Sequence, residues 1–143
     1  TYPNGCHVVT VEVDIETGEV KILRYVTGQD CGTIINAMMV EGQVTGGVAH
    51  GIGNALYECM RYDDDAQPLT VNFGEYLLPL ATETPRVEQV HMESPTPLNQ
   101  LGVKGAGEGG TIPAAAAIAS AIDDALRPFG VKITQVPVTP EYL

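Results

Sequence analysis

The sequence lacks long apolar runs and is poor in basic residues. No window of about 18 apolar residues is present, so no membrane-spanning helix is predicted. The first 20 residues lack a basic stretch followed by an apolar one, so we expect no signal peptide. Only 7 residues are basic against 18 acidic ones, and a net charge of −11 repels a phosphate backbone. The composition therefore argues against nucleic-acid binding and predicts a soluble protein.

Cysteine pairs and metal-ligand clusters are also missing. No Cys-x-x-Cys occurs, and the three cysteines lie far apart, at Cys6, Cys31 and Cys59. An odd, scattered set predicts reduced thiols in a cytoplasmic protein rather than a disulfide framework. The three histidines do not have metal-ligand spacing, so we predict no site at which this chain's side chains bind a metal.

The chain has 143 residues, which is long enough for one domain with a hydrophobic core. It begins with Thr1 and not with an initiator methionine. We therefore expect residues 1–143 to be a single domain that is a segment of a longer protein.

The first 32 residues predict a β-hairpin and a loop. Valine and isoleucine alternate with polar residues over residues 9–15, which is the period of a half-buried strand. Residues 16–19 have the composition of a turn, and residues 20–26 return as the second strand. Residues 28–32 are predicted to form a loop.

A glycine-rich helix is predicted over residues 38–60, where apolar residues recur every four positions. Five glycines between positions 42 and 53 oppose this helix by roughly 5 kcal/mol in total. Tertiary packing or a bound ligand must offset that cost. We expect the helix to be broken or bent near its glycines and to pack under the glycine-rich loop described below.

The rest of the chain predicts further strands and an alanine-rich helix. Thr111 is placed to cap that helix and Gly130 to end it. Strands are predicted over 69–78, 87–92 and 131–136. The elements together predict an α+β fold.

Residues 102–110 form a glycine-rich loop with one acidic residue, Glu108. Its Gly105-x-Gly107-x-x-Gly110 spacing matches a dinucleotide-binding pattern, but Glu108 inside the cradle would repel a pyrophosphate. The flanking glycines remove side chains around Glu108, so a large rigid partner could approach, and the carboxylate could act as a general base. A surface turn with an incidental glutamate is the open alternative.

Gln43 begins a second glycine-rich segment, residues 42–53, and offers two donors and an acceptor. A polar ligand could approach it along the glycine-lined face. The alternative is a tight contact between helices with Gln43 at its rim. His50, in the same segment, is predicted to be a partly buried histidine rather than a ligand.

Two long motifs, in this order, carry a resemblance to a known family. Residues 42–58, GQVTGGVAHGIGNALYE, resemble the cofactor-contacting segment of the molybdopterin-binding large subunits of molybdenum hydroxylases. Residues 101–110, LGVKGAGEGG, resemble their catalytic-glutamate loop. The similarity spans almost the whole chain, which resembles the C-terminal part of those subunits and one lobe of their molybdopterin-binding domain. It is closest in character to the carbon monoxide dehydrogenase branch.

The resemblance implies that Glu108 is the catalytic base beside molybdenum. It implies that the cofactor is bound by Gln43, Gly46, Gly47, Gly105 and Gly107. The cofactor would be molybdopterin cytosine dinucleotide, with iron–sulfur clusters and FAD on partner subunits of an oligomeric enzyme.

The substrate implied by the resemblance is carbon monoxide, an aldehyde or an N-heterocycle. The sequence does not choose among these three, because the segment that decides among them lies outside it. The isolated chain is expected to be inactive and to hold no molybdenum. A stand-alone binding or assembly domain derived from the family is the alternative function. An open reading frame that continues far upstream would favour the enzyme.

Overall fold

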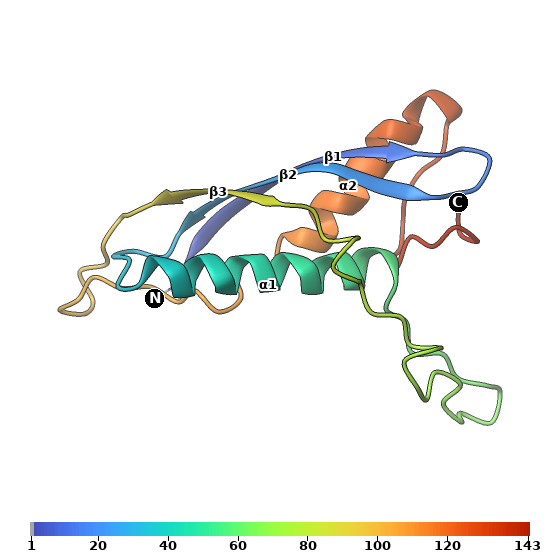
Figure 1. Ribbon diagram of the computed structural model, residues 1–143, viewed down its shortest axis with the longest axis horizontal. Coiled ribbons are helices and arrows are strands. Elements are labelled where there is room, and N and C mark those ends of the chain that lie inside the picture. The colour runs from blue at the N-terminus through green and yellow to red at the C-terminus, as the bar shows by residue number, and fades with distance from the viewer. Residues whose placement is uncertain (1) are drawn as a thin grey trace.

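The computed structural model describes residues 2–143 and has two layers (Figure 1). One layer is a three-stranded sheet in the order β1-β2-β3. The other consists of two helices that cover one face of it. The prediction of an α+β fold is confirmed. The elements in chain order are β1 (Asn4–Val13), β2 (Val20–Asp30), α1 (Ala37–Leu56), β3 (Val87–Met92), α2 (Ala114–Leu126) and the 3-10 helix η1 (Arg127–Phe129).

The predicted hairpin is confirmed, but it is longer than its sequence pattern. β1 and β2 pair antiparallel from Asn4 opposite Asp30 to Val13 opposite Val20. β2 also pairs in parallel with β3, so the loop predicted over 28–32 is wrong for residues 28–30. Gly28 belongs to the central strand because neighbouring strands bond its backbone on both sides, and a ladder does not require a side chain.

Helix α1 is continuous over 20 residues, so the helix is confirmed and the predicted break is wrong. Its predicted extension over residues 57–60 is also wrong, because α1 ends at Leu56. Asn36 caps it, with the side-chain oxygen accepting a hydrogen bond of 3.1 Å from the Met39 backbone N–H. The glycines do not interrupt it because part of the helix packs backbone to backbone against the loop that precedes α2. No helix within residues 2–143 has the length and apolar character needed to cross a membrane.

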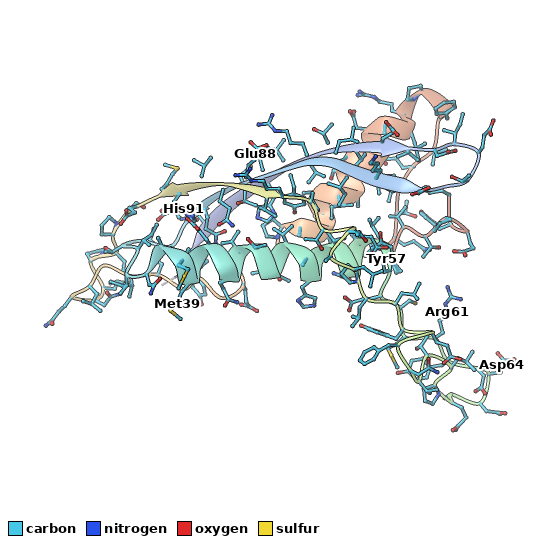
Figure 2. The ribbon with its side chains drawn as sticks, viewed as in Figure 1. Met39, Tyr57, Arg61, Asp64, Glu88 and His91 are labelled. Atoms are coloured by element: carbon cyan, nitrogen blue, oxygen red, sulfur yellow. The ribbon has the colours of Figure 1, made fainter. Side chains whose placement is uncertain are left out.

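The core lies between the sheet and the two helices. Tyr25 is fully buried on the inner face of β2, against the apolar sides of α1 and α2. β3 has one face toward α1, and Figure 2 shows His91 directed to that side and Glu88 to the opposite one. The core residues are Tyr25, Val48, Ile52, Ala55, Leu56, Ala114, Ile118, Ile122, Leu126 and Val138.

The predicted strand 69–78 is wrong, and this segment is irregular. It lies in an arm, also containing Arg61 and Asp64, that projects from the end of α1 (Figures 1 and 2). Backbone N–H groups here bond to nearby side chains, as Gly74 does to Asn72 at 2.8 Å. Such local bonds compete with a strand ladder.

The strand predicted over 131–136 is also wrong, for a related reason. The Ile133 N–H donates to the Asp123 carboxylate at 2.9 Å, and the Thr134 N–H donates to the Tyr142 hydroxyl at 3.1 Å. These side chains take the backbone donors that a neighbouring strand would need.

The C-terminal helix is confirmed, whereas its predicted cap is wrong. α2 follows Pro113, without a side-chain cap. The Thr111 hydroxyl instead donates to the Gly47 carbonyl at 2.9 Å. Gly130 follows η1 with φ of 72°, which matches its predicted role as a terminator.

Candidate functional site

A hydrogen bond joins the two motifs that the sequence singles out. Gln43 lies on the exposed side of α1, and its side-chain Nε2 donates to the Gly107 carbonyl at 3.0 Å. The two residues are 64 positions apart. The chain therefore brings the glycine-rich helix and the Glu108 loop to one place.

The loop and α1 approach so closely that side chains would not fit between them. A Cβ atom at Gly47 would lie 2.8 Å from the Gly110 Cα atom, and one at Gly110 would overlap the Val44 carbonyl oxygen. One turn further along α1, a Cβ at Gly51 would overlap the side chain of Ala114. Glycine is required at these positions for close packing of backbone on backbone.

Other glycines of the two motifs face open space. A Cβ atom at Gly42, Gly46 or Gly107 would meet nothing within 4 Å. Gly105 is exposed as well. Of the glycines predicted to contact a cofactor, Gly46, Gly105 and Gly107 are thus accessible beside Gln43, whereas Gly47 lies in the packed seam.

Glu108 is exposed between the open Gly107 and the buried Gly109. Its backbone carbonyl accepts hydrogen bonds from Thr111 at 3.0 Å and from Ile112 at 3.1 Å, which turns the chain toward α2. Within residues 2–143 its carboxylate has no hydrogen-bond or ion-pair partner, so a bound molecule could reach it.

An ionic network around the buried Asp30 carboxylate, which the sequence did not reveal, holds the start of the loop. Lys104 Nζ donates to Asp30 Oδ2 at 2.9 Å and to Ser94 Oγ at 3.0 Å, and the Ser94 hydroxyl donates to the same Asp30 oxygen at 2.5 Å. The hydroxyl of Ser94, the ammonium of Lys104 and the backbone N–H groups of Gly32 and Ser94 hold the pKa of Asp30 well below its ordinary value. A lone aspartate in the predicted loop 28–32 and a lone lysine in a glycine-rich loop were the only sequence signal for this pair.

Two grooves within residues 2–143 lie elsewhere, around the hairpin turn at Gly18. They have volumes of about 450 and 470 Å³. Neither is lined by Gln43 or Glu108. Within residues 2–143, no group of three or more His, Cys, Asp and Glu side chains is arranged to hold a metal ion.

Comparison with known proteins identifies the family. A family model described as the molybdopterin cofactor-binding domain matches residues 1–85. The gamma subunit of the 6-hydroxypseudooxynicotine dehydrogenase complex of Paenarthrobacter nicotinovorans is 47% identical, over 99% of this chain and 18% of the relative. The carbon monoxide dehydrogenase large chain of Afipia carboxidovorans is 34% identical, over 96% of this chain and 17% of the relative.

A solved structure has the same fold. The crystal structure of quinoline 2-oxidoreductase from Pseudomonas putida 86 is 42% identical, with a TM-score of 0.95 over 98% of this chain and 18% of that one. The chain thus spans less than a fifth of the length of these relatives. Because the family model covers more than half of the chain and the relatives match nearly all of it, the chain belongs to the molybdenum hydroxylase family, as part of its molybdopterin cofactor-binding domain.

Proposed function

We propose that this chain supplies the catalytic base, Glu108, and part of the cofactor-binding surface of a molybdenum-dependent hydroxylase subunit. The observation that carries the proposal is the hydrogen bond from Gln43 to the Gly107 carbonyl, the residue before Glu108. It places the loop with the exposed carboxylate directly beside the open glycines of α1. A cofactor that contacts this face of α1 would therefore reach Glu108.

The residues beside Glu108 fit the molybdopterin cofactor. Gly42, Gly46 and Gly107 expose backbone where a side chain would meet nothing, so a flat, polar ring system can lie against them. Gln43 donates to Gly107 through its amide nitrogen, and its carbonyl oxygen remains suited to accept a hydrogen bond from the cofactor. When bound, the cofactor brings a molybdenum centre that accepts electrons from the substrate.

Glu108 is suited to hold a proton during the reaction. Its carboxylate is exposed, and it is free of partners within residues 2–143, so either oxygen can take a proton from a hydroxyl group of the bound molecule. Its backbone is held from both sides, by the Gln43 bond before it and the Thr111 bond after it. The backbone that carries this base therefore needs little reorganisation when the proton moves.

The chain's exposed apolar side chains support a segment of a larger subunit rather than a stand-alone domain. Phe73, Leu98 and Ile112 are 78%, 80% and 69% exposed. The projecting arm alone exposes eight large apolar side chains, those of Met60, Tyr62, Leu69, Val71, Phe73, Leu77, Leu78 and Leu80. A concentration of this kind marks a surface that another body covers. The remainder of the large subunit is the partner that we propose for them, with residues 1–143 as one domain.

The same proposal extends to the cofactor form, the partner subunits and the location of the whole protein. We infer molybdopterin cytosine dinucleotide as the cofactor form, with iron–sulfur and FAD subunits in an oligomer. The printed names of relatives, such as "subunit gamma" and "large chain", support a multi-subunit enzyme. Three free cysteines support a cytoplasmic location.

The proposed substrate is carbon monoxide, an aldehyde or an N-heterocycle. Relatives named for nicotine derivatives and quinoline are 47% and 42% identical, against 34% for one named for carbon monoxide. These identities favour an N-heterocycle.

The substitution Glu108→Gln in the full-length subunit tests the proposal. Glutamine keeps the size of the side chain but cannot take a proton, so turnover per bound molybdenum should fall by about 10²- to 10⁴-fold with normal molybdenum content. Glu12→Gln, at an exposed position on β1, is the control with the same change of charge. Unchanged turnover per molybdenum in Glu108→Gln would remove Glu108 from catalysis.

A further inference from the structure

The inner face of the sheet becomes polar toward the Glu108 loop. At the hairpin-turn end of the strands, this face is apolar and belongs to the core. Nearer the loop, two neighbouring cross-strand rows consist almost entirely of glutamine, histidine and threonine. These rows are Gly5–Gln29–His91 and His7–Thr27–Gln89.

Gln29 lies directly against the loop at Gly109. Its side chain is 2% exposed, and neither its Nε2 nor its Oε1 atom has a hydrogen-bond partner within residues 2–143. A Cβ atom built on Gly109 would fall directly on the Gln29 amide. The amide therefore occupies the space in which a side chain of residue 109 would stand, immediately after Glu108.

The position of Gln29 in the sheet makes it a rigid support. It lies on the central strand, paired with Gly5 on one side and His91 on the other. His7, on β1, adjoins the same loop. Burial lowers the pKa of His7 and the nearby backbone of Gly109 opposes that change, although His7 Nε2 has no well-formed hydrogen bond. The loop thus packs against side chains of both β1 and β2.

The loop has few other constraints at this point. A Cβ atom at Gly107 would meet nothing within 4 Å, so one side of the loop is open. Gln43 holds the loop before Glu108, and the seam with α1 begins at Gly110. Between these two points, Gln29 is the side chain that fills the space beneath the backbone.

We propose that Gln29 is a positioning residue, whose amide supports Gly109 and so sets the direction of the Glu108 carboxylate. Gln29 supports the loop by filling space and not by hydrogen bonding, because its amide atoms make no hydrogen bond to the loop. The inference rests on the proposed function of Glu108 as a base. It also assigns a physical reason for glycine at position 109, which has no positive φ that would require it.

The test uses the full-length subunit in its complex and compares Gln29→Ala with Gln29→Met. Alanine leaves a void under Gly109, so hydrogen exchange of residues 105–111 should become faster. Turnover per molybdenum should then fall by about 10- to 100-fold, with a shifted pH profile. Methionine keeps the length of glutamine without its amide, so it should preserve both loop protection and turnover. Loss of both loop protection and turnover in Gln29→Met would overturn the proposal that Gln29 acts by filling space.

The substitution Thr27→Val is the matched control. Thr27 is fully buried on the same face of β2, and its hydroxyl also has no partner within residues 2–143. A Cβ on Gly109 would meet Gln29, and its three nearest atoms include none of Thr27. Exchange in the loop should therefore be unchanged in Thr27→Val. Equal acceleration in Thr27→Val and Gln29→Ala would show a general loss of packing and would overturn the proposal.

A double variant tests the contact itself. Gly109→Ala alone must displace the Gln29 amide or lift the loop, so it should accelerate exchange in the loop. Gln29→Ala with Gly109→Ala gives the new methyl group the vacated space, so the double variant should be less impaired than the two single effects combined. Additive effects would contradict direct contact between these positions.

Failure of this inference can be told from failure of the proposed function. If Glu108 is not the base, Gln29→Ala still accelerates exchange in the loop, while Glu108→Gln leaves turnover per molybdenum unchanged. If Gln29 does not position the loop, Gln29→Ala leaves exchange unchanged, while Glu108→Gln still lowers turnover per molybdenum.

Discussion

The Nζ atom of Lys104 lies 2.9 Å from Oδ2 of Asp30, and each of these two side chains is only 12% exposed. The pair joins the end of β2 to the loop that carries Glu108, across 74 positions of sequence. It is the most buried ion pair of residues 2–143, since the other pairs each include a side chain that is 63% or more exposed.

Removing the Lys104 charge should destabilise the chain. In Lys104→Met the Asp30 carboxylate loses its ion-pair partner in a mostly buried place, which costs more than the pair itself contributed. We expect the folding equilibrium constant to fall by at least about tenfold in urea denaturation. Lys132→Met is the control, because Lys132 is 77% exposed and its pair with Asp123 should contribute little. Equal losses in both variants would contradict the burial argument.

The Asp30 network should make stability depend on pH in the acid range. The folded-state pKa of Asp30 is lowered by Ser94, Lys104 and backbone N–H groups, so the unfolded chain binds the proton more readily. The stabilisation is complete above the unfolded pKa of about 4 and is lost as the pH falls from there through the folded pKa. Urea midpoints of the wild type should fall more steeply below about pH 4 than those of Asp30→Asn. Parallel curves would contradict this assignment.

Alanine at two adjacent glycines of α1 should have opposite effects on stability. Gly46→Ala should stabilise the chain by up to about 1 kcal/mol, because its Cβ meets nothing and alanine favours a helix. Gly47→Ala should destabilise it, because its Cβ would lie 2.8 Å from the Gly110 Cα atom. Thermal denaturation of the two variants measures both changes in stability.

The same two variants separate folding from cofactor binding. If the open face of α1 contacts the cofactor, Gly46→Ala in the full-length subunit should lower cofactor content although it stabilises the fold. Full cofactor content in Gly46→Ala would argue against contact at this position.

Removing the amide donor of Gln43 should break its hydrogen bond to the Gly107 carbonyl. In Gln43→Glu a carboxylate would face the Gly107 carbonyl, so the hydrogen bond is replaced by repulsion between two acceptors. We expect faster hydrogen exchange in residues 105–109 and a loss of stability of about 1 kcal/mol. Gln100→Glu, at an exposed position, is the matched control for the added charge. Unchanged exchange in Gln43→Glu would show that the bond does not hold the loop.

The sequence by itself determined the local elements. Alternation in the hairpin and the four-residue repeat in α1 are local patterns of apolar residues, and the structure follows both. Gln43 and Glu108 were candidates from their glycine-rich surroundings and from the family resemblance. That Gln43 bonds to the loop of Glu108 was not readable from either motif alone.

Tertiary structure decided where strands form and what each glycine does. Residues 69–78 have an acceptable strand composition, but a strand needs a neighbouring backbone, and side chains such as Asn72 take its donors first. Gly46 and Gly47 are adjacent and identical in sequence terms, yet one is open and the other is packed on Gly110. The contacts of Asp30 with Lys104 and of Gln29 with Gly109 join residues far apart in the chain. Such contacts depend on how the helices and the loop pack on the sheet, because no local pattern brings distant backbones together.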